Sequence, residues 1–276
     1  MRSGWHQRQA ASGANLRVSA SGLVGALAGD GCGRVGEVRP HRTSPLRSAR
    51  RYCDPVNDAI QSLVNELVAD SGVRGVLLFG SHARGNARPD SDADLAIFVE
   101  QDGFVMGCSE RDGQEFELIR LSEAAAIGYF TDNRDAAADV WQVAKILYDP
   151  DGVIARVRDH VLGLLAEGKP PMDAARIEWS RFAAADRFSA AAGLALTNQA
   201  AARMVLHERV LELTATFFDV RQLWAPPMKR RLEAIGDINP ELYGLLERIF
   251  GPDVSVDEQV QLARLTLPLV YEKRSA

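Results

Sequence analysis

The chain has 276 residues, of which 46% are hydrophobic and 25% charged, and a formal net charge of −5. This length suits one large domain or two ordinary ones, and the composition is that of a soluble globular protein. The acidic balance gives no general reason to expect nucleic acid as a partner. No stretch approaches the roughly 20 apolar residues that cross a bilayer, so we expect no membrane partner either.

The first 52 residues differ from the rest of the chain. They contain nine Arg, no Lys and only two acids, and they are rich in Gly, Ser and Ala without helical or strand periodicity. Such a segment buries little apolar surface, so residues 1–52 are expected to be a disordered tail, with a targeting segment or nucleic-acid arm as the alternative. Cys32, Cys53 and Cys108 are too widely spaced for a disulfide framework or a metal knuckle, which fits a reducing cytoplasm.

Residues 53–150 carry the signals of an α+β unit. Asp54-Pro55 is typical of a helix start, and the apolar spacing after it predicts a helix over 55–70. Apolar runs predict strands, which we expect at 73–79, 92–99 and 115–121. A turn region at 103–113 and a helical stretch at 122–147 complete this unit.

A second unit is expected after the turn residues at 148–152, so the boundary is placed at residue 150. Residues 151–276 show only helical spacing, interrupted by Pro170-Pro171 and Pro226-Pro227. Asn239-Pro240 caps one expected helix, and the run from Ser255 to Glu258 fits a capping box before the last one. These signals predict an all-α bundle.

Two loops of the first unit combine residues suited to phosphate and metal binding. Gly80-Ser81 follows an apolar strand, and a glycine there lets backbone amides approach phosphate oxygens closely, while Arg84 can neutralise a phosphate. Asp92 and Asp94 lie at alternate positions of the next strand, so their side chains share a face about 7 Å apart along it. Glu117 stands in the third strand between apolar neighbours. Unpaired carboxylates in such places are costly, whereas converging carboxylates can hold Mg²⁺.

Three other interpretations of these loops were weighed. A Walker A phosphate loop fails because Asn86-Ala87 stands where Lys and Ser/Thr are required. A calcium-binding EF-hand fails because Leu95 replaces the glycine and Gln101 the bidentate Glu. A polar turn that caps an ordinary strand would explain any one of these residues but not their joint occurrence.

Three short motifs resemble those of the DNA polymerase beta-type nucleotidyltransferase superfamily, and in particular its small bacterial members, the minimal nucleotidyltransferases and antibiotic adenylyltransferases. These motifs are Phe79-Gly80-Ser81, Ala83-Arg84-Gly85 and Ser91-Asp92-Ala93-Asp94-Leu95. The resemblance covers roughly residues 57–120, and it implies an α+β nucleotidyltransferase domain with a short mixed sheet, followed by a helical accessory domain.

The resemblance also implies roles for single residues. Gly80 and Ser81 would bind the triphosphate of a nucleoside triphosphate donor, with Arg84 and Ser91 in the same motif. Asp92 and Asp94 would bind magnesium. The third carboxylate of the family is commonly Asp in an apolar strand, and here Glu117 matches it, with Glu115 as the alternative.

The expected activity is magnesium-dependent transfer of a nucleoside monophosphate, AMP from ATP, to a hydroxyl of a small molecule such as an antibiotic. The alternative acceptor is a side chain of a partner protein, as in protein-modifying or antitoxin-type enzymes. A nucleotide-binding regulator without activity would not need all three carboxylates. The oligomeric state is left open, with a homodimer as one option.

The acceptor is expected to be read by the helical unit, across a cleft from Asp92 and Asp94. Glu178 and Glu208 are candidate general bases there, although solvent-exposed helix positions explain both more simply. Lys145 could reach a phosphate but is more typical of a surface lysine. His207 shares an apolar helix face, which favours a core histidine.

Overall fold

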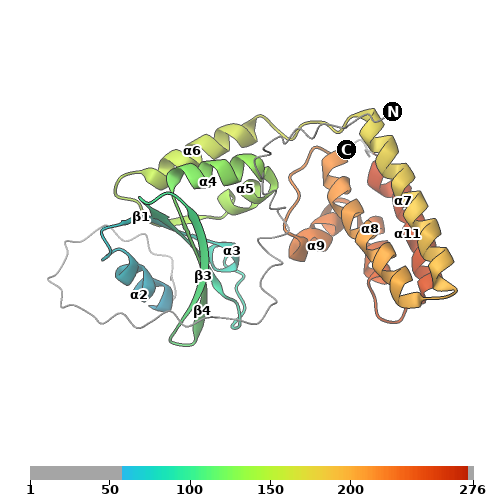
Figure 1. Cartoon of the computed structure of the whole chain (residues 1–276), viewed down its shortest axis with the longest axis horizontal. Coiled ribbons are helices and arrows are strands. Elements are labelled where there is room, and N and C mark those ends of the chain that lie inside the picture. Colours follow the sequence, from blue (N-terminus) through green and yellow to red (C-terminus); the bar gives the residue numbers. More distant parts are fainter. Residues whose placement is uncertain (1–57, 273–276) are drawn as a thin grey trace, which may run out of the picture.

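The computed structural model describes residues 58–272 (Figure 1). The expected tail and the Asp54-Pro55 helix start lie outside these residues. None of the helices that are described is both long and apolar enough to span a membrane. The structure is of the α+β class, with one mixed sheet followed by a series of helices.

A five-stranded sheet forms the first part, in the order β3-β4-β2-β1-β5. Its strands are β1 Val73–Phe79, β2 Ala93–Val99, β3 Phe104–Arg111, β4 Gln114–Leu121 and β5 Lys145–Tyr148. Strand β2 pairs antiparallel with β1 and parallel with β4, and the two outer strands pair antiparallel with their neighbours. The central strands β1 and β2 follow the predicted apolar runs, because both of their faces are covered.

Helices cover the two faces of the sheet. Helix α2 (Asp58–Leu67) packs on one face, where its apolar stripe shares a core with Val76, Leu78 and Ile97. Helices α4 (Glu123–Asp132), α5 (Arg134–Trp141) and α6 (Val153–Ala166) pack on the other face, against residues such as Leu77 and Phe98. Neighbouring residues of one strand therefore enter different cores, as the strand period of two requires.

Two strands were missed by the sequence analysis. Strand β3 occupies the segment that was expected to be a turn region, and most of its residues are exposed, so it has no apolar alternation. The stretch 122–147 was expected to be helical, but helix α4 ends at Asp132, α5 follows, and β5 begins at Lys145. The four residues of β5 are too few to show a strand period.

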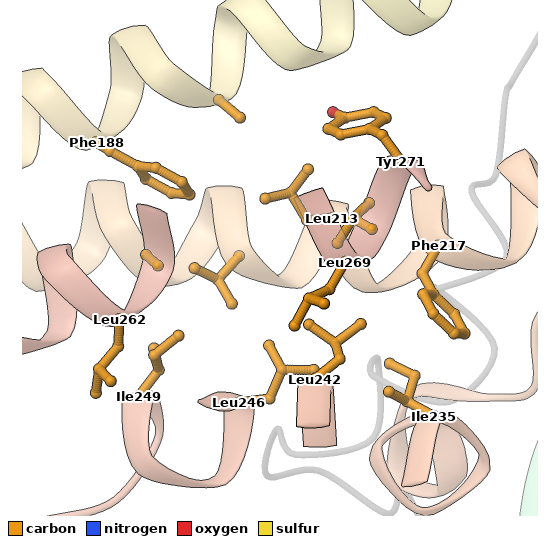
Figure 2. Packing of buried hydrophobic residues seen from close by; sticks show 14 of the residues in the cluster. Phe188, Leu213, Phe217, Ile235, Leu242, Leu246, Ile249, Leu262, Leu269 and Tyr271 are labelled. Atoms are coloured by element: carbon orange, nitrogen blue, oxygen red, sulfur yellow. The ribbon is translucent and has the colours of Figure 1, made fainter. Parts of the chain in front are cut away.

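The second part is a helical bundle with its own core (Figure 2). Its helices are α7 Ala174–Ala195, α8 Gln199–Val220, α9 Met228–Ile238, α10 Pro240–Ile249 and α11 Val256–Tyr271. Two predicted caps are confirmed. The Asn239 side chain accepts from the N–H of Leu242 at 3.0 Å, and the Ser255 hydroxyl accepts from the N–H of Glu258 at 3.3 Å.

Helix α6 belongs with the sheet by its contacts. It packs against α4, α5 and β1, and Ile154, Val157 and Val161 are buried in the core on that face of the sheet. By sequence this helix is expected in the helical unit, because it follows the turn at 148–152. The division of the chain into domains stays a prediction, and the contacts of α6 favour a boundary after this helix.

Candidate active site

The turn between β1 and the short helix α3 (Gly80–Arg84) requires glycine at its first position. Gly80 has a φ of 68°, in the left-handed region that glycine adopts without strain. A Cβ atom at Gly80 would lie 1.7 Å from the Oδ2 atom of Asp94, which faces this turn from β2. Glycine therefore serves both the turn and the close approach of a carboxylate to the backbone.

The Asp94 carboxylate is held against this turn by the backbone. The N–H of Ser81 donates a hydrogen bond to it, and Asp94 pairs with Phe79 in the ladder between β1 and β2. The position of Asp94 is thus set by the sheet register and by the Gly80-Ser81 turn together.

Three carboxylates meet at this edge of the sheet. One oxygen from each of Asp92, Asp94 and Glu117 lies within 4.8 Å of the other two. Asp94 and Glu117 are direct partners in the parallel pairing of β2 with β4, which places both side chains on the same face. Glu115 is not in this cluster, so the geometry favours Glu117 over Glu115 as the third carboxylate.

The cluster is electrostatically unfavourable without a cation. Burial, followed by repulsion from Asp92 and Glu117, raises the pKa of Asp94 to about 7. Burial and the charge of Asp92 also raise the pKa of Glu117. Lys229, at the start of α9, acts in the opposite direction on both groups. Hard oxygen ligands that repel one another in this way fit a divalent cation such as Mg²⁺, which would relieve the repulsion.

The two other predicted phosphate ligands already have partners within the protein. Arg84 donates from Nη2 to the Asp139 carboxylate of α5 at 3.0 Å, and both side chains are largely buried. The Ser91 hydroxyl accepts from the backbone N–H of Arg88 at 2.9 Å. The Ser91 carbonyl accepts from Gln114 Nε2 at 2.8 Å. Ser91 therefore orders the loop before β2, and Arg84 would meet a phosphate only with its remaining N–H groups.

None of the secondary candidates belongs to the cluster of three carboxylates. Lys145 is the first residue of β5, paired with Leu78 of β1, rather than the end of a helix. Glu178 and Glu208 are exposed on α7 and α8, and neither is among the groups whose charge acts on Asp94 or Glu117. His207 is half-buried, its ring packs edge-on against Phe250, and burial lowers its pKa.

Sequence reasoning missed three residues near the site. Asp139 binds Arg84, and Arg230 of α9 forms an ion pair with the same Asp139 carboxylate. Lys229 is close enough to the carboxylates to influence them. The only signal in the sequence was the basic run Lys229-Arg230-Arg231 after Pro226-Pro227, which is also typical of a solvated helix face.

Residues 60–158 match the family described as Nucleotidyltransferase domain, which spans the sheet, α3 and the three carboxylates. No curated protein matches the chain. Among solved structures, the chain is similar to a crystal structure of a nucleotidyltransferase-like protein from Exiguobacterium sibiricum 255-15, with 13% identity and a TM-score of 0.42. That match covers 77% of this chain and 73% of the other.

Proposed function

We propose a specific reaction for this protein. Residues 60–158 form a nucleotidyltransferase domain of the DNA polymerase beta-type superfamily, so the protein is a nucleotidyltransferase. The protein transfers a nucleoside monophosphate, AMP from ATP, to a hydroxyl group of a small molecule. The observation that carries this proposal is the cluster of Asp92, Asp94 and Glu117 against the Gly80-Ser81 turn.

The donor is held at the turn and at the carboxylates. Gly80 has no side chain to keep phosphate oxygens away from the backbone, and the Ser81 hydroxyl adds a donor. Asp92, Asp94 and Glu117 would hold Mg²⁺, which when bound neutralises the triphosphate and the departing pyrophosphate. The spacing of the three carboxylates and the raised pKa of Asp94 support such a site.

The transfer itself is an in-line displacement at phosphorus. The acceptor oxygen forms a bond to the α-phosphorus of the donor, and the bond from that phosphorus to the pyrophosphate oxygen breaks. The hydroxyl proton passes to a carboxylate of the site. We assign it to Glu117, because Asp94 is engaged by the Ser81 N–H and Glu117 stands beside Asp94 on the neighbouring strand.

The acceptor is assigned to the helical part of the chain, because the recognisable residues of the sheet part would be used to bind triphosphate and metal. The subclass suggested by the motifs is that of small bacterial enzymes such as antibiotic adenylyltransferases. Glu178 and Glu208 stay predictions as acceptor-binding residues, and both are exposed on the helical part. A cytoplasmic location likewise stays a prediction from the widely spaced cysteines.

Transfer of label from α-³²P nucleoside triphosphates tests this proposal. The protein is incubated with magnesium, each of the four nucleotides in turn, a panel of hydroxyl-bearing antibiotics, and a cell lysate. We expect label on a small molecule, with ATP preferred, and none with the Asp94→Asn variant. Label on a protein would instead support the protein-modifying alternative. No release of pyrophosphate with any nucleotide or acceptor would contradict nucleotidyl transfer by this site.

A further inference from the structure

One row of paired residues runs across the sheet from the phosphate turn to the edge strand. Phe79, which precedes the Gly80-Ser81 turn, pairs with Asp94. Asp94 pairs with Glu117, and Glu117 pairs with Cys108 on the edge strand β3. Side chains of directly paired residues point to the same face of a sheet. The Cys108 side chain therefore lies beside Glu117, on the side away from Asp94.

The order of residues along this row gives the displacement a direction. The attacking and leaving oxygens lie roughly in line, on opposite sides of the phosphorus. In the proposed reaction the leaving pyrophosphate is held at the Gly80-Ser81 turn, which is at the β1 end of the row. The acceptor oxygen therefore approaches from the other end, where Glu117 and β3 lie. Glu117, which would take the acceptor's proton, stands between the two ends.

Strand β3 offers an apolar surface at the acceptor end of the row. Phe104, Met106 and Cys108 occupy alternate positions of β3, so they share the face that carries Glu117. The Phe104 ring packs against Tyr129 of α4, with 5.8 Å between the ring centroids, and this contact fixes one end of the strip. Phe104 and Met106 are nevertheless 39% and 38% exposed, and Cys108 is also exposed. A contiguous exposed apolar surface beside reactive groups is typical of a binding site.

We propose that the β3 strip, formed by Phe104, Met106 and Cys108, binds the acceptor next to its reacting hydroxyl. The acceptor is then a hydroxyl compound whose carbon skeleton has an apolar face beside that hydroxyl. This inference rests on the proposed function and adds to it a part of the acceptor site that lies on the sheet, in addition to the helical part. The β3 strip selects and orients the acceptor, while Glu117 takes the proton.

A hydroxyl tethered to Cys108 through a disulfide tests the place of the acceptor. The protein is modified with 5-mercaptopentan-1-ol and given α-³²P ATP and magnesium. The tethered oxygen forms a bond to the α-phosphorus and pyrophosphate leaves, so a reductant should release a labelled thiol. The control tether is at Val105→Cys in a Cys108→Ser protein, because Val105 is 64% exposed on the opposite face of β3. Both proteins carry Cys32→Ser and Cys53→Ser, which leaves one thiol in each.

We expect labelling of the tether at Cys108 and at least about ten-fold less at the control position, because transfer depends steeply on where the reacting oxygen lies. A second tether tests the apolar character of the β3 strip. 2-(2-Mercaptoethoxy)ethanol has the same chain length as 5-mercaptopentan-1-ol, with an ether oxygen in place of one methylene. Burial of one methylene corresponds to about a four-fold change, so the pentanol tether should be labelled about four-fold faster. Met106→Gln should abolish this preference, and Val105→Gln should keep it.

Two results would overturn the inference alone, both in a protein that binds ATP with magnesium. One is equal labelling of the tethers at positions 108 and 105, or labelling of neither. The other is equal labelling of the two kinds of tether at Cys108, which would show that the β3 strip does not select an apolar acceptor. If the unmodified protein binds no nucleoside triphosphate with magnesium, the proposed function fails, and the inference fails with it.

Discussion

Asp94 is placed where a carboxylate is least stable without a cation. The group is mostly buried, lies beside two other acids, and has a pKa raised to about 7 from an ordinary value of 3.8. In the folded protein it holds its proton more tightly than in the unfolded chain. Its contribution to stability is therefore fully present only below about pH 4 and is lost as the pH rises from there through 7. This unfavourable charge is what a bound divalent cation would offset.

Replacement of Asp94 by Asn separates stability from activity. At pH 8 the neutral amide removes the repulsion, so we expect the metal-free variant to be more stable than the unchanged protein by roughly 1–3 kcal/mol, and by a smaller amount at pH 5, where only part of the penalty is present. Nucleotidyl transfer should be abolished, because an amide is a weak magnesium ligand. Urea unfolding with a chelator at both pH values measures the first effect. The control is Asp90→Asn at a fully exposed carboxylate. Equal stability of Asp94→Asn and the unchanged protein at pH 8 would refute the explanation.

Gly80 and Gly85 provide a matched pair for the turn. Both have positive φ values, 68° and 80°, so alanine strains the backbone at either position. Only at Gly80 does a Cβ atom meet the Asp94 carboxylate, whereas nothing lies within 4 Å of it at Gly85. Calorimetry with ATP and magnesium should show loss of binding for Gly80→Ala and near-normal affinity for Gly85→Ala. Similar affinities for the two variants would show that the approach of Asp94 to Gly80 is unimportant.

The sequence indicates the candidate site residues of the sheet part but not those of α9. Asp92, Asp94 and Glu117 could be singled out because a carboxylate inside an apolar strand needs a reason, and the strand period places alternate residues on one face. Lys229 and Arg230 lie more than 100 residues further on, in a basic run with no such conflict. Their position depends on how the bundle packs against the sheet, which no local pattern encodes.

At the scale of elements, burial decided which strands could be predicted. Strands β1 and β2 are covered on both faces and appear in the sequence as continuous apolar runs. Strand β3 is the edge strand, exposed along most of its length, and its pairing with β4 follows from the tight turn at Asp112-Gly113, where both φ values are positive. A strand held mainly by its neighbour leaves little trace in hydrophobic patterning.

Helix α7 shows why an aromatic residue in a helix does not by itself indicate the core. Phe188 is fully buried against α8 and α11, whereas Phe182 and Trp179 are 63% and 68% exposed and contact each other on the outer face. Phe188→Ala should lower the free energy of unfolding by about 3–5 kcal/mol, because it opens a cavity in the bundle core. Phe182→Ala should change it by no more than about 0.5 kcal/mol. Urea unfolding of the two variants compares the same substitution on one helix, and equal losses would show that the outer face is covered.

At the scale of the whole molecule, one lysine ties the segment between α6 and α7 to both parts. The Lys169 ammonium group donates to Asp135 of α5 at 2.9 Å and forms an ion pair with Asp219 of α8 at 2.7 Å. Asp135 also accepts from the backbone N–H of Ala225 at 2.8 Å, in the segment that leads to α9. This network holds the bundle against the sheet part on the side from which α9 approaches the site.

Loss of Lys169 should lower both the stability of the protein and its affinity for nucleotide. Lys169→Met removes the ammonium group that contacts both Asp135 and Asp219, and the charge of Arg231 remains beside them. We therefore expect the free energy of unfolding to fall by about 1–3 kcal/mol. Nucleotide affinity should fall as well if α9 depends on this contact. The control Arg158→Met removes an exposed cation paired only with its neighbour Asp159 and should change stability by no more than about 0.5 kcal/mol. A Lys169→Met protein as stable as this control would show that the Lys169 network does not stabilise the folded protein.

The central claim is that the three carboxylates and the Gly80-Ser81 turn form one site for a metal-bound nucleoside triphosphate. Isothermal titration of the unchanged protein with ATP, in magnesium and in a chelator, tests it most directly. We predict saturable binding with magnesium and none that is measurable in the chelator, because ATP would then face three unneutralised acids. Equal affinity in the two conditions would contradict the claim.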